Sequence, residues 1–308
     1  MVSSADRVAG PATENGFTDG GDPPHMIVSG SASQSFAAAL ADATGRDLAA
    51  VEFERFPDGE LKASVPGFDA GEAVVVASTV SADAHVECLQ LQDAAREAGA
   101  SEVTTVLPYM GYARQDETFD AGEPVSARAV ARAVSTGTDR VLTVNPHERS
   151  VCDFFDVPAV AVDAAGRLAE PLPADLADPL FLSPDEGAID LAAAVRETYD
   201  RGATDHFAKE RDYDTGEVAV EPSDAAVDGR DVVLVDDIVA TGSTMSESIA
   251  HLHDRGVGRV FVTCVHPLLA AGARTRLARA GVAAIHGTDT IERPVSTVSA
   301  APAVADHL

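Results

Sequence analysis

Residues 232–244 read VVLVDDIVATGST, and this stretch indicates the class of fold. Its apolar residues are typical of a buried β-strand, which ends in the adjacent acids Asp236 and Asp237. A small, hydroxyl-rich turn follows, and a helical pattern then runs over residues 243–255. An apolar strand that leads through a tight turn into a helix is typical of parallel sheets covered by helices, so the stretch predicts an α/β fold.

The same alternation of strand and helix extends in both directions from this stretch. Further strand patterns occupy residues 26–30, 73–78, 103–107, 140–144, 159–162, 179–182, 259–265 and 282–285. Helical patterns lie at residues 31–44, 85–98, 123–136, 188–199 and 270–280. Because these strands are mostly apolar and alternate with helices, we expect mainly parallel sheets with helices on both faces.

The chain has 308 residues, which slightly exceeds what one hydrophobic core usually holds. We therefore predict two related domains, the first at residues 26–163 and the second at residues 164–308. Residues 1–25 are rich in Gly, Pro, Ser, Thr and Asp without apolar periodicity, so we expect a disordered leader. The clean strand pattern from Met26 leaves open whether the true start is Met1 or Met26.

The charge of the chain argues against several classes of protein. Asp and Glu number 50 against 22 Lys and Arg, which gives a formal net charge of −28. A surface this acidic repels phosphate backbones and anionic lipids, so we expect neither a nucleic acid nor a membrane as partner. Only Lys62 and Lys209 are lysines. Acid excess with so few lysines is typical of a halophilic protein, since molar salt screens the repulsion; an acidic mesophilic enzyme is the alternative.

The sequence also bears on the compartment. No apolar run approaches the roughly 18 residues that span a bilayer, and the first residues lack the pattern of a signal peptide. The three cysteines, Cys88, Cys152 and Cys264, form no CxxC pair and are expected to be buried thiols in a reducing compartment. We therefore expect a cytoplasmic protein.

The turn after Asp237 has the chemistry of a phosphate site. Its backbone N–H groups and hydroxyls converge at the N-terminus of a helix, which suits a phosphate monoester. The two adjacent acids can accept hydrogen bonds from the vicinal hydroxyls of a sugar, so ribose 5-phosphate fits both parts. The candidate residues are Asp236, Asp237, Ala240, Thr241, Gly242, Ser243 and Thr244. The alternative, in which an Asp and a Thr merely cap a helix, does not call for the second Asp.

The 232–244 stretch resembles the phosphoribosyl-diphosphate binding motif of the type I phosphoribosyltransferase fold. Other segments resemble one family of that fold, ribose-phosphate diphosphokinase (PRPP synthase). They are FPDGE at 56–60, PYMGYARQD at 108–116, GEPVS at 122–126, NPHE at 145–148, SPDEG at 183–187 and KER at 209–211. The resemblance runs from about residue 26 to residue 290. It departs from the family pattern at Asn145, where many members have Asp, and at Ala188, which replaces the second Gly of SPDxGG.

This resemblance implies two type I phosphoribosyltransferase-like domains and a set of site residues. ATP would be bound by Phe56, Asp58, Glu60, Arg114, Gln115 and His147, and Mg²⁺ by His147 and Asp185. Lys209 and Arg211 resemble the K-x-R of the family's mobile catalytic loop. Taken alone, these residues have plainer interpretations: residues 56–60 form a turn, His147 and Asp185 cap helices, and Lys209 is a retained surface lysine.

The implied activity is that of a ribose-phosphate diphosphokinase. Such an enzyme transfers the diphosphoryl group of ATP to the 1-hydroxyl of ribose 5-phosphate, giving 5-phosphoribosyl 1-diphosphate and AMP. A phosphoribosyltransferase of the same fold is one alternative, but it needs only one such domain. A catalytically silent regulatory homologue is another, and it is expected to lack the loop cations. The family forms dimers that stack into larger rings, so we expect a homo-oligomer, a dimer or higher.

Overall fold

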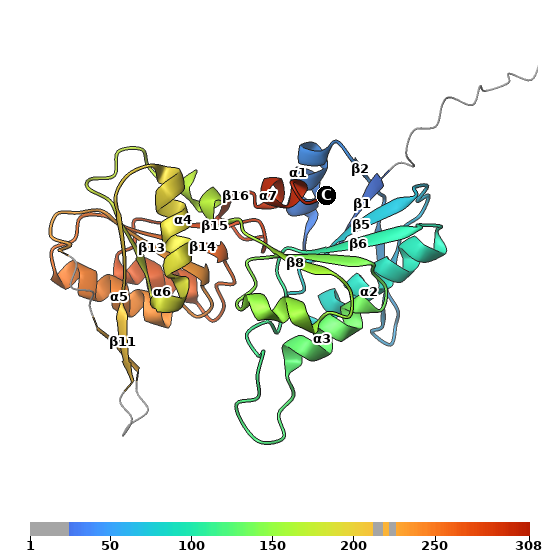
Figure 1. Cartoon of the computed structure of the whole chain (residues 1–308), viewed down its shortest axis with the longest axis horizontal. Coiled ribbons are helices and arrows are strands. Elements are labelled where there is room, and N and C mark those ends of the chain that lie inside the picture. The colour runs from blue at the N-terminus through green and yellow to red at the C-terminus, as the bar shows by residue number, and fades with distance from the viewer. Residues whose placement is uncertain (1–24, 212–217, 222–225) are drawn as a thin grey trace, which may run out of the picture.

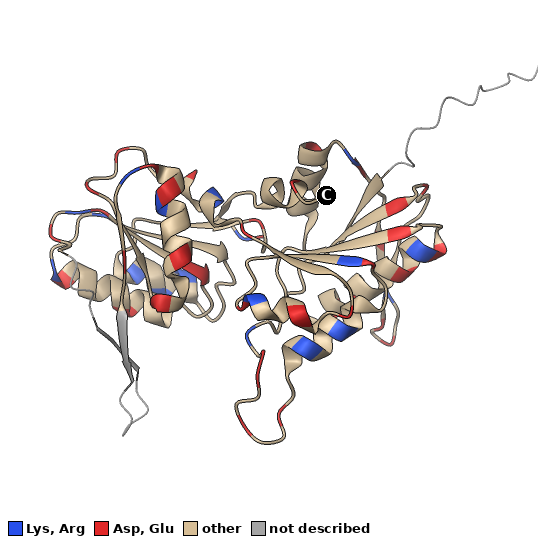
Figure 2. Ribbon diagram, viewed as in Figure 1, with Lys and Arg blue, Asp and Glu red and all other residues tan. Residues whose placement is uncertain are grey.

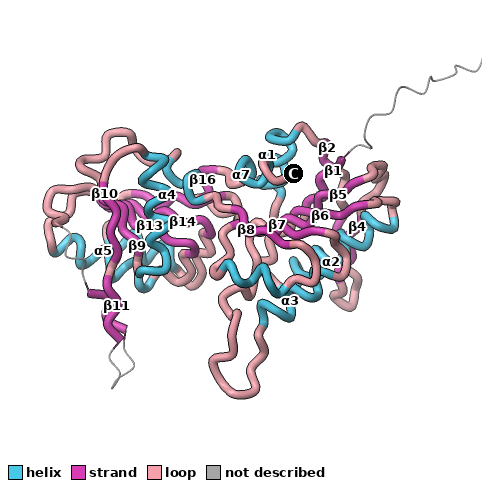
Figure 3. The backbone as a smooth tube through the Cα atoms, in the orientation of Figure 1, coloured by secondary structure: helices cyan, strands magenta, loops and turns pink. Residues whose placement is uncertain are grey.

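A computed structural model describes residues 25–211, 218–221 and 226–308. In these residues the chain forms two α/β units, each built on a parallel sheet of six strands (Figure 1, Figure 3). The predicted fold class is therefore confirmed. The predicted leader, residues 1–25, lies outside the described residues except for His25, which is the first residue of a strand and not part of a leader. The predicted domain bounds stay a prediction.

The first sheet has the strand order β2-β1-β5-β6-β7-β8. Its strands are β1 (His25–Ser29), β2 (Asp47–Leu48), β5 (Glu72–Val76), β6 (Glu102–Leu107), β7 (Arg140–Val144) and β8 (Ala159–Val162). Helix α1 (Gln34–Thr44) covers one face, and α2 (Ala82–Glu97) and α3 (Ser126–Ser135) cover the other. The side chains alternate accordingly, since Val74 and Val76 pack in the cluster of α1 while Val75 packs in that of α2.

The second sheet has the order β10-β9-β13-β14-β15-β16. Its strands are β9 (Leu180–Ser183), β10 (Ala203–His206), β13 (Val232–Ile238), β14 (Val260–His266), β15 (Ala284–Thr288) and β16 (Ser296–Val298). Helix α4 (Ile189–Tyr199) packs with Val233 and Val235, whereas α5 (Ser243–Asp254) and α6 (Ala273–Ala280) pack with Leu234. Helices thus cover both faces here as well.

The described residues also form two antiparallel hairpins and three short 3-10 helices. One hairpin joins β3 (Glu52–Arg55) to β4 (Leu61–Ser64) in the first half, and the other joins β11 (Ala208–Arg211) to β12 (Val218–Glu221) in the second. The 3-10 helices lie at Arg149–Phe154, Ala165–Ala169 and Glu186–Ala188.

The last helix returns to the first half of the chain. Helix α7 (Ala301–Ala305) lies against α1 in Figure 1, and Val304 shares one buried cluster with Phe36 of α1 and Phe181 of β9. Polar contacts support this arrangement, because Arg46 donates to the carbonyl of Leu308 over 2.9 Å. The apolar core is therefore continuous from the first sheet to the second.

Two simpler expectations can also be compared with the structure. Cys88 and Cys264 are buried as predicted, Cys152 is half-buried, and all three are free thiols. Among the described residues, no helix combines the length and the apolar character that crossing a membrane requires.

Candidate active site

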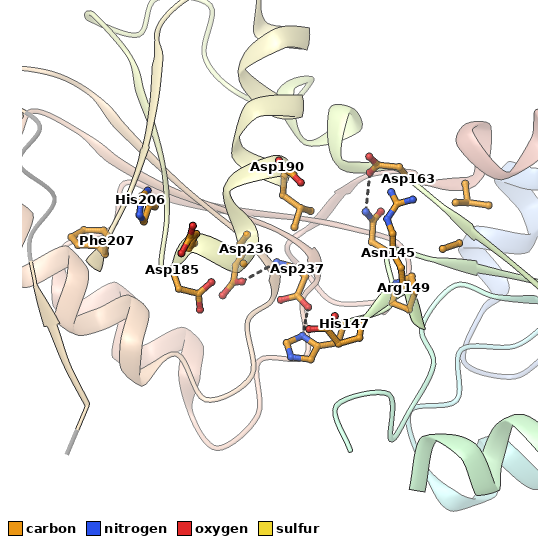
Figure 4. Close-up of a pocket in the computed structure, with 18 residues that line it drawn as sticks. Asn145, His147, Arg149, Asp163, Asp185, Asp190, His206, Phe207, Asp236 and Asp237 are labelled. Atoms are coloured by element: carbon orange, nitrogen blue, oxygen red, sulfur yellow. Dashed lines mark hydrogen bonds and ion pairs between the residues drawn. The ribbon is translucent and has the colours of Figure 1, made fainter. Parts of the chain in front are cut away.

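A cavity of about 920 Å³ lies where the carboxyl ends of β7, β8, β9 and β13 meet, so both halves of the chain line it. Because ligands of open α/β sheets bind outside the carboxyl ends of the strands, this is the expected place for a site. Figure 4 shows the polar side chains gathered there. Those that carry the chemistry below are Asn145, His147, Asp163, Asp185, Asp236 and Asp237.

Asp236 and Asp237 lie near the carboxyl end of β13, as the sequence predicts. Burial, the Asp237 carboxylate and the charge of Asp185 together raise the pKa of Asp236 well above its usual range. Burial also acts to raise the pKa of Asp237, but the hydrogen bond and charge of His147, together with a hydrogen bond to Asp236 and the electrostatic effect of His266, outweigh it, and the pKa is lowered. Two neighbouring acids thus differ in their tendency to ionise, and Asp237 is the one that holds the negative charge.

His147 comes from the first half of the chain and contacts the acids of the second. Its Nδ1 lies 2.6 Å from Oδ2 of Asp237. This hydrogen bond raises the pKa of His147, although burial opposes it. The predicted metal-linked histidine and the predicted sugar-binding acid are therefore one hydrogen-bonded pair across the two halves.

Asp185 follows β9 and faces the same cavity. The hydroxyl of Ser183 donates to the Asp185 carbonyl over 2.6 Å, which fixes the turn. A Cβ at Gly187 would lie 3.2 Å from the Asp185 carboxylate, so the backbone that comes closest to this carboxylate is at a glycine. Ala188, where the family pattern has Gly, is buried at φ −101, a conformation open to any residue.

The turn at residues 240–244 lies next to the acids along the chain but outside the lining of the cavity. Gly242 is buried with φ 71, in the left-handed region, and starts α5. The hydroxyls of Thr241 and Ser243 are 2.9 Å apart, and Thr241, Ser243 and Thr244 are exposed to solvent. Exposed hydroxyls at a helix N-terminus fit the predicted phosphate loop.

Arg114 lies in a small pocket beside the main cavity, together with Tyr109, His147 and Asp237. Gln115, its neighbour, accepts a hydrogen bond from the hydroxyl of Ser126 at the start of α3. Arg114 is therefore brought next to the predicted site. Gln115 is fixed in the same segment.

Phe56, Asp58 and Glu60 lie on the turn of the β3–β4 hairpin and do not line the cavity. All three are exposed, and the Asp58 carboxylate accepts from the backbone N–H of Glu60 over 3.2 Å. Within one chain these residues are thus not brought together with His147 and Asp185.

Lys209 and Arg211 lie on β11, which pairs with β12. Their side chains fall outside the part of the chain that is described. The strand begins directly after His206 and Phe207, both of which line the cavity, so the hairpin starts at the rim of the site.

Sequence reasoning assigned no site role to Asn145 and did not identify Asp163; the two lie side by side on the cavity wall (Figure 4). Nδ2 of Asn145 donates to Oδ1 of Asp163 over 2.8 Å, and Asn145 has φ 33. The sequence does contain a pattern that could have identified Asp163. This residue directly follows the apolar strand at 159–162, and Asp185 likewise follows the strand at 179–182. Polar residues at that end of parallel strands converge.

The described residues contain no group of three or more His, Cys, Asp or Glu side chains placed to hold a metal ion together. His147 and Asp185 do line one cavity. A metal ion bound at this cavity would need further ligands, such as substrate phosphates and water.

Comparison with known proteins gives a consistent result for both halves. Residues 25–137 match the N-terminal domain of ribose phosphate pyrophosphokinase, and residues 159–297 match the phosphoribosyl transferase domain. A ribose-phosphate pyrophosphokinase of Halobacterium salinarum is 66% identical over 92% of this chain and 100% of its own length. One of Methanosarcina mazei is 44% identical over 92% and 94%. Among solved structures, phosphoribosylpyrophosphate synthetase from Mycobacterium smegmatis superimposes with a TM-score of 0.77 at 26% identity, covering 92% of this chain and 97% of that one.

Proposed function

The chain belongs to the ribose-phosphate pyrophosphokinase family, and from that premise we propose how its residues carry out the reaction. The enzyme is a ribose-phosphate diphosphokinase, which transfers the diphosphoryl group of ATP to the 1-hydroxyl of ribose 5-phosphate. The observation that carries the assignment of residues is the convergence of His147, Asp185, Asp236 and Asp237 on one cavity.

Ribose 5-phosphate binds at the carboxyl end of β13. Asp236 and Asp237 accept hydrogen bonds from the ribose hydroxyls, and Asp237 does so as an ionised carboxylate because His147 lowers its pKa. The 5-phosphate lies on the turn formed by Ala240, Thr241, Gly242, Ser243 and Thr244, where backbone N–H groups and hydroxyls donate to its oxygens. Binding the sugar at both ends aims its 1-hydroxyl at the second substrate.

ATP binds on the side of the first half. Arg114 contacts phosphate oxygens with its planar set of donors, and Gln115 and His147 complete that part of the site. Phe56, Asp58 and Glu60 are assigned to the adenine base. Because they lie on a hairpin away from this chain's cavity, we propose that they serve the ATP site of a neighbouring subunit in a homo-oligomer.

The residues around the cavity fit Mg²⁺. Carboxylate oxygens are its preferred protein ligands. The negative charges of Asp237 and Asp185 add to burial in raising the pKa of Asp236, and a bound cation would offset this repulsion between carboxylates. We assign Asp185 and His147 to the ion. Asp237 holds Nδ1 of His147, which fixes the ring and leaves Nε2 to face a ligand. When bound, the ion supplies positive charge against the phosphates.

The ribose 1-hydroxyl loses its proton to water and its oxygen bonds to the β-phosphorus. The bond from that phosphorus to the bridging oxygen breaks, and this oxygen leaves as part of AMP. Negative charge builds up on the phosphoryl oxygens during the transfer. Lys209 and Arg211 are assigned to offset that charge, together with Arg114. Positioning of the two substrates supplies most of the remaining acceleration.

Two further properties belong to the same proposal. The tandem match to two domains favours the synthase over a phosphoribosyltransferase, which needs only one. The three free cysteines support a reducing, cytoplasmic location.

One assay tests the assignment. Protein, MgATP and ribose 5-phosphate are incubated in molar salt, and AMP is measured against time. We expect Asp237→Asn to raise KM for ribose 5-phosphate by about tenfold or more, because an amide has one acceptor oxygen where the carboxylate has two and it carries no charge. Lys209→Ala should lower kcat by about a hundredfold, since the lost charge acts in the transition state.

Asp254→Asn provides a matched control, because Asp254 is exposed at the end of α5 in the same half. Its kinetics should equal those of the wild type. If Asp237→Asn behaved like this control, the sugar-binding assignment would be wrong, and unchanged turnover in Lys209→Ala would remove the loop assignment alone. Failure of folded wild-type protein to form AMP would contradict the function.

A further inference from the structure

His266 is the last residue of β14 and lies between the two halves of the chain. It is 4% exposed, and both ring nitrogens are hydrogen bonded. Nε2 lies 3.0 Å from the backbone carbonyl of Asn145 in the first half, and Nδ1 lies 2.9 Å from the hydroxyl of Thr290 in the second. His266 has no part in the proposed binding of either substrate or of the metal ion.

The partners define the hydrogen positions on the ring. A carbonyl can only accept, so Nε2 of His266 carries the proton and donates it to Asn145. Nδ1 is then an acceptor, and the Thr290 hydroxyl is shared between Nδ1, 2.9 Å away, and the Val265 carbonyl, 2.8 Å away. Burial lowers the pKa of His266, which keeps the ring neutral in this arrangement. The side chain therefore makes one directed link from the second half to the first.

The backbone around His266 holds the start of the phosphate turn. The N–H of Val239 donates to the His266 carbonyl over 3.2 Å. Three and four residues after His266, the N–H of Leu269 donates to the Val239 carbonyl and that of Ala270 to the Ala240 carbonyl, each over 2.9 Å. The segment that carries the imidazole is thus fixed to the segment that leads to the 5-phosphate of the sugar.

On the first half, the ring contacts two segments assigned to ATP and metal. Asn145 begins the Asn145–Pro146–His147 sequence, and its amide is already occupied by Asp163 and the N–H of Ala164. Only its carbonyl is directed at His266. The imidazole also packs edge-on against Tyr109, with ring centroids 5.2 Å apart, in the segment that continues to Arg114.

From this geometry we infer that His266 is a positioning residue, which sets the phosphate turn of the sugar site against the His147 and Arg114 segments of the ATP site. The inference rests on the proposed function. Loss of the His266 hydrogen bond to Asn145 should lower kcat and leave KM nearly unchanged. Each substrate keeps its own contacts, but the placement of one substrate against the other depends on this hydrogen bond. A displacement of about 1 Å between reacting groups can cost about a hundredfold in rate with little change in binding.

The test compares two amides in place of the imidazole. The amide nitrogen of His266→Gln reaches about as far as Nε2 and can donate to the Asn145 carbonyl, whereas that of His266→Asn reaches only as far as Nδ1. We expect kcat to fall by about thirtyfold in His266→Asn and by about threefold or less in His266→Gln, with both KM values within about threefold of wild type. Circular dichroism and the melting temperature report whether each variant is folded.

His286→Asn is the matched control, because His286 lies on the adjacent strand β15 and is hydrogen bonded to Thr297 of the same half. Its kcat should be unchanged. Equal turnover in the Asn and Gln variants of His266, whether high or low, would overturn the inference while the wild type still forms AMP. If the wild type formed none, the proposed function would fail and the inference with it.

A second variant decides the matter if His266→Asn does not fold. Thr290→Val keeps the shape of the side chain and the imidazole but removes the hydroxyl that orients the ring. We expect a loss in kcat of about threefold or more at unchanged KM. Unchanged kcat in folded Thr290→Val would overturn the inference.

Discussion

Asp231 directly precedes β13 and organises the end of that strand remote from the cavity. It is 3% exposed, and its carboxylate accepts hydrogen bonds from the backbone N–H groups of Ala177 and Arg259 and from the Arg259 guanidinium. Burial alone would raise the pKa of Asp231, but these donors outweigh it and lower the pKa below its usual value. A single ionised side chain thus joins three segments beneath the sugar site.

We predict that Asp231→Asn lowers the free energy of unfolding by about 2 kcal/mol near neutral pH, because donors remain that a neutral amide cannot satisfy. Since the folded-state pKa is depressed, the stabilisation by Asp231 is present above the unfolded-state pKa of about 3.9 and is lost as pH falls through the folded-state value. Denaturant unfolding of the wild type and of Asp231→Asn, from neutral pH to below the pKa of Asp231, measures this stabilisation.

The difference between wild type and Asp231→Asn should therefore shrink as the solution becomes more acidic. Asp254→Asn, at an exposed position, should show no such difference at any pH. A gap between wild type and Asp231→Asn that did not depend on pH would contradict the role of the charge.

At the level of elements, α7 has only five residues but contributes strongly to the stability of the fold. Val304 is fully buried in the cluster that includes α1. We predict that Val304→Ala destabilises the protein by about 2 kcal/mol, through lost burial and the cavity left behind. Thermal unfolding in molar salt measures this, with Asp306→Ala, an exposed neighbour, as control. Equal stability of the two variants would show that α7 adds nothing to the core.

The elements that could be predicted from the sequence are those with a long apolar period. Strands β7 and β8 have the predicted bounds, and α5 begins at the predicted residue. Strand β2 has two residues, both exposed, and β3 has four exposed residues, so neither has the apolar pattern of a buried strand. They form because partner strands lie beside them, and that information is not local in the sequence.

In the candidate site, too, some residues could be predicted from the sequence and others could not. Asp236, Asp237 and Asp185 could be predicted because polar residues at the ends of apolar strands are visible in the sequence. The pairing of His147 with Asp237 could not, since it spans 90 positions and depends on how the two halves pack. His266 gave no local signal, because it reads as one more residue after an apolar strand.

At the scale of the whole molecule, the acid excess covers both halves (Figure 2). With a net charge of −28 and a relative of 66% identity in Halobacterium salinarum, the chain is halophilic. Salt screens the repulsion among these carboxylates, because the Debye length falls from about 10 Å at 0.1 M to about 3 Å at 1 M. The folded state, which brings the charges close together, gains more from this than the unfolded chain.

We therefore predict that the melting temperature rises steeply between about 0.1 M and about 2 M KCl, over the range in which screening becomes nearly complete. Differential scanning calorimetry measures it, and activity should follow the same dependence. A melting temperature that did not change over this range would contradict the halophilic character.

The return of α7 to the first half also bears on how the protein is made. Translation proceeds from the N-terminus, so α1 and its sheet leave the ribosome long before residues 301–305 exist. The nascent chain therefore carries an incompletely covered apolar face while the second half is being synthesised, a condition that exposes it to chaperones and to aggregation. Packing of the first half is completed only when residues 301–305 have been translated.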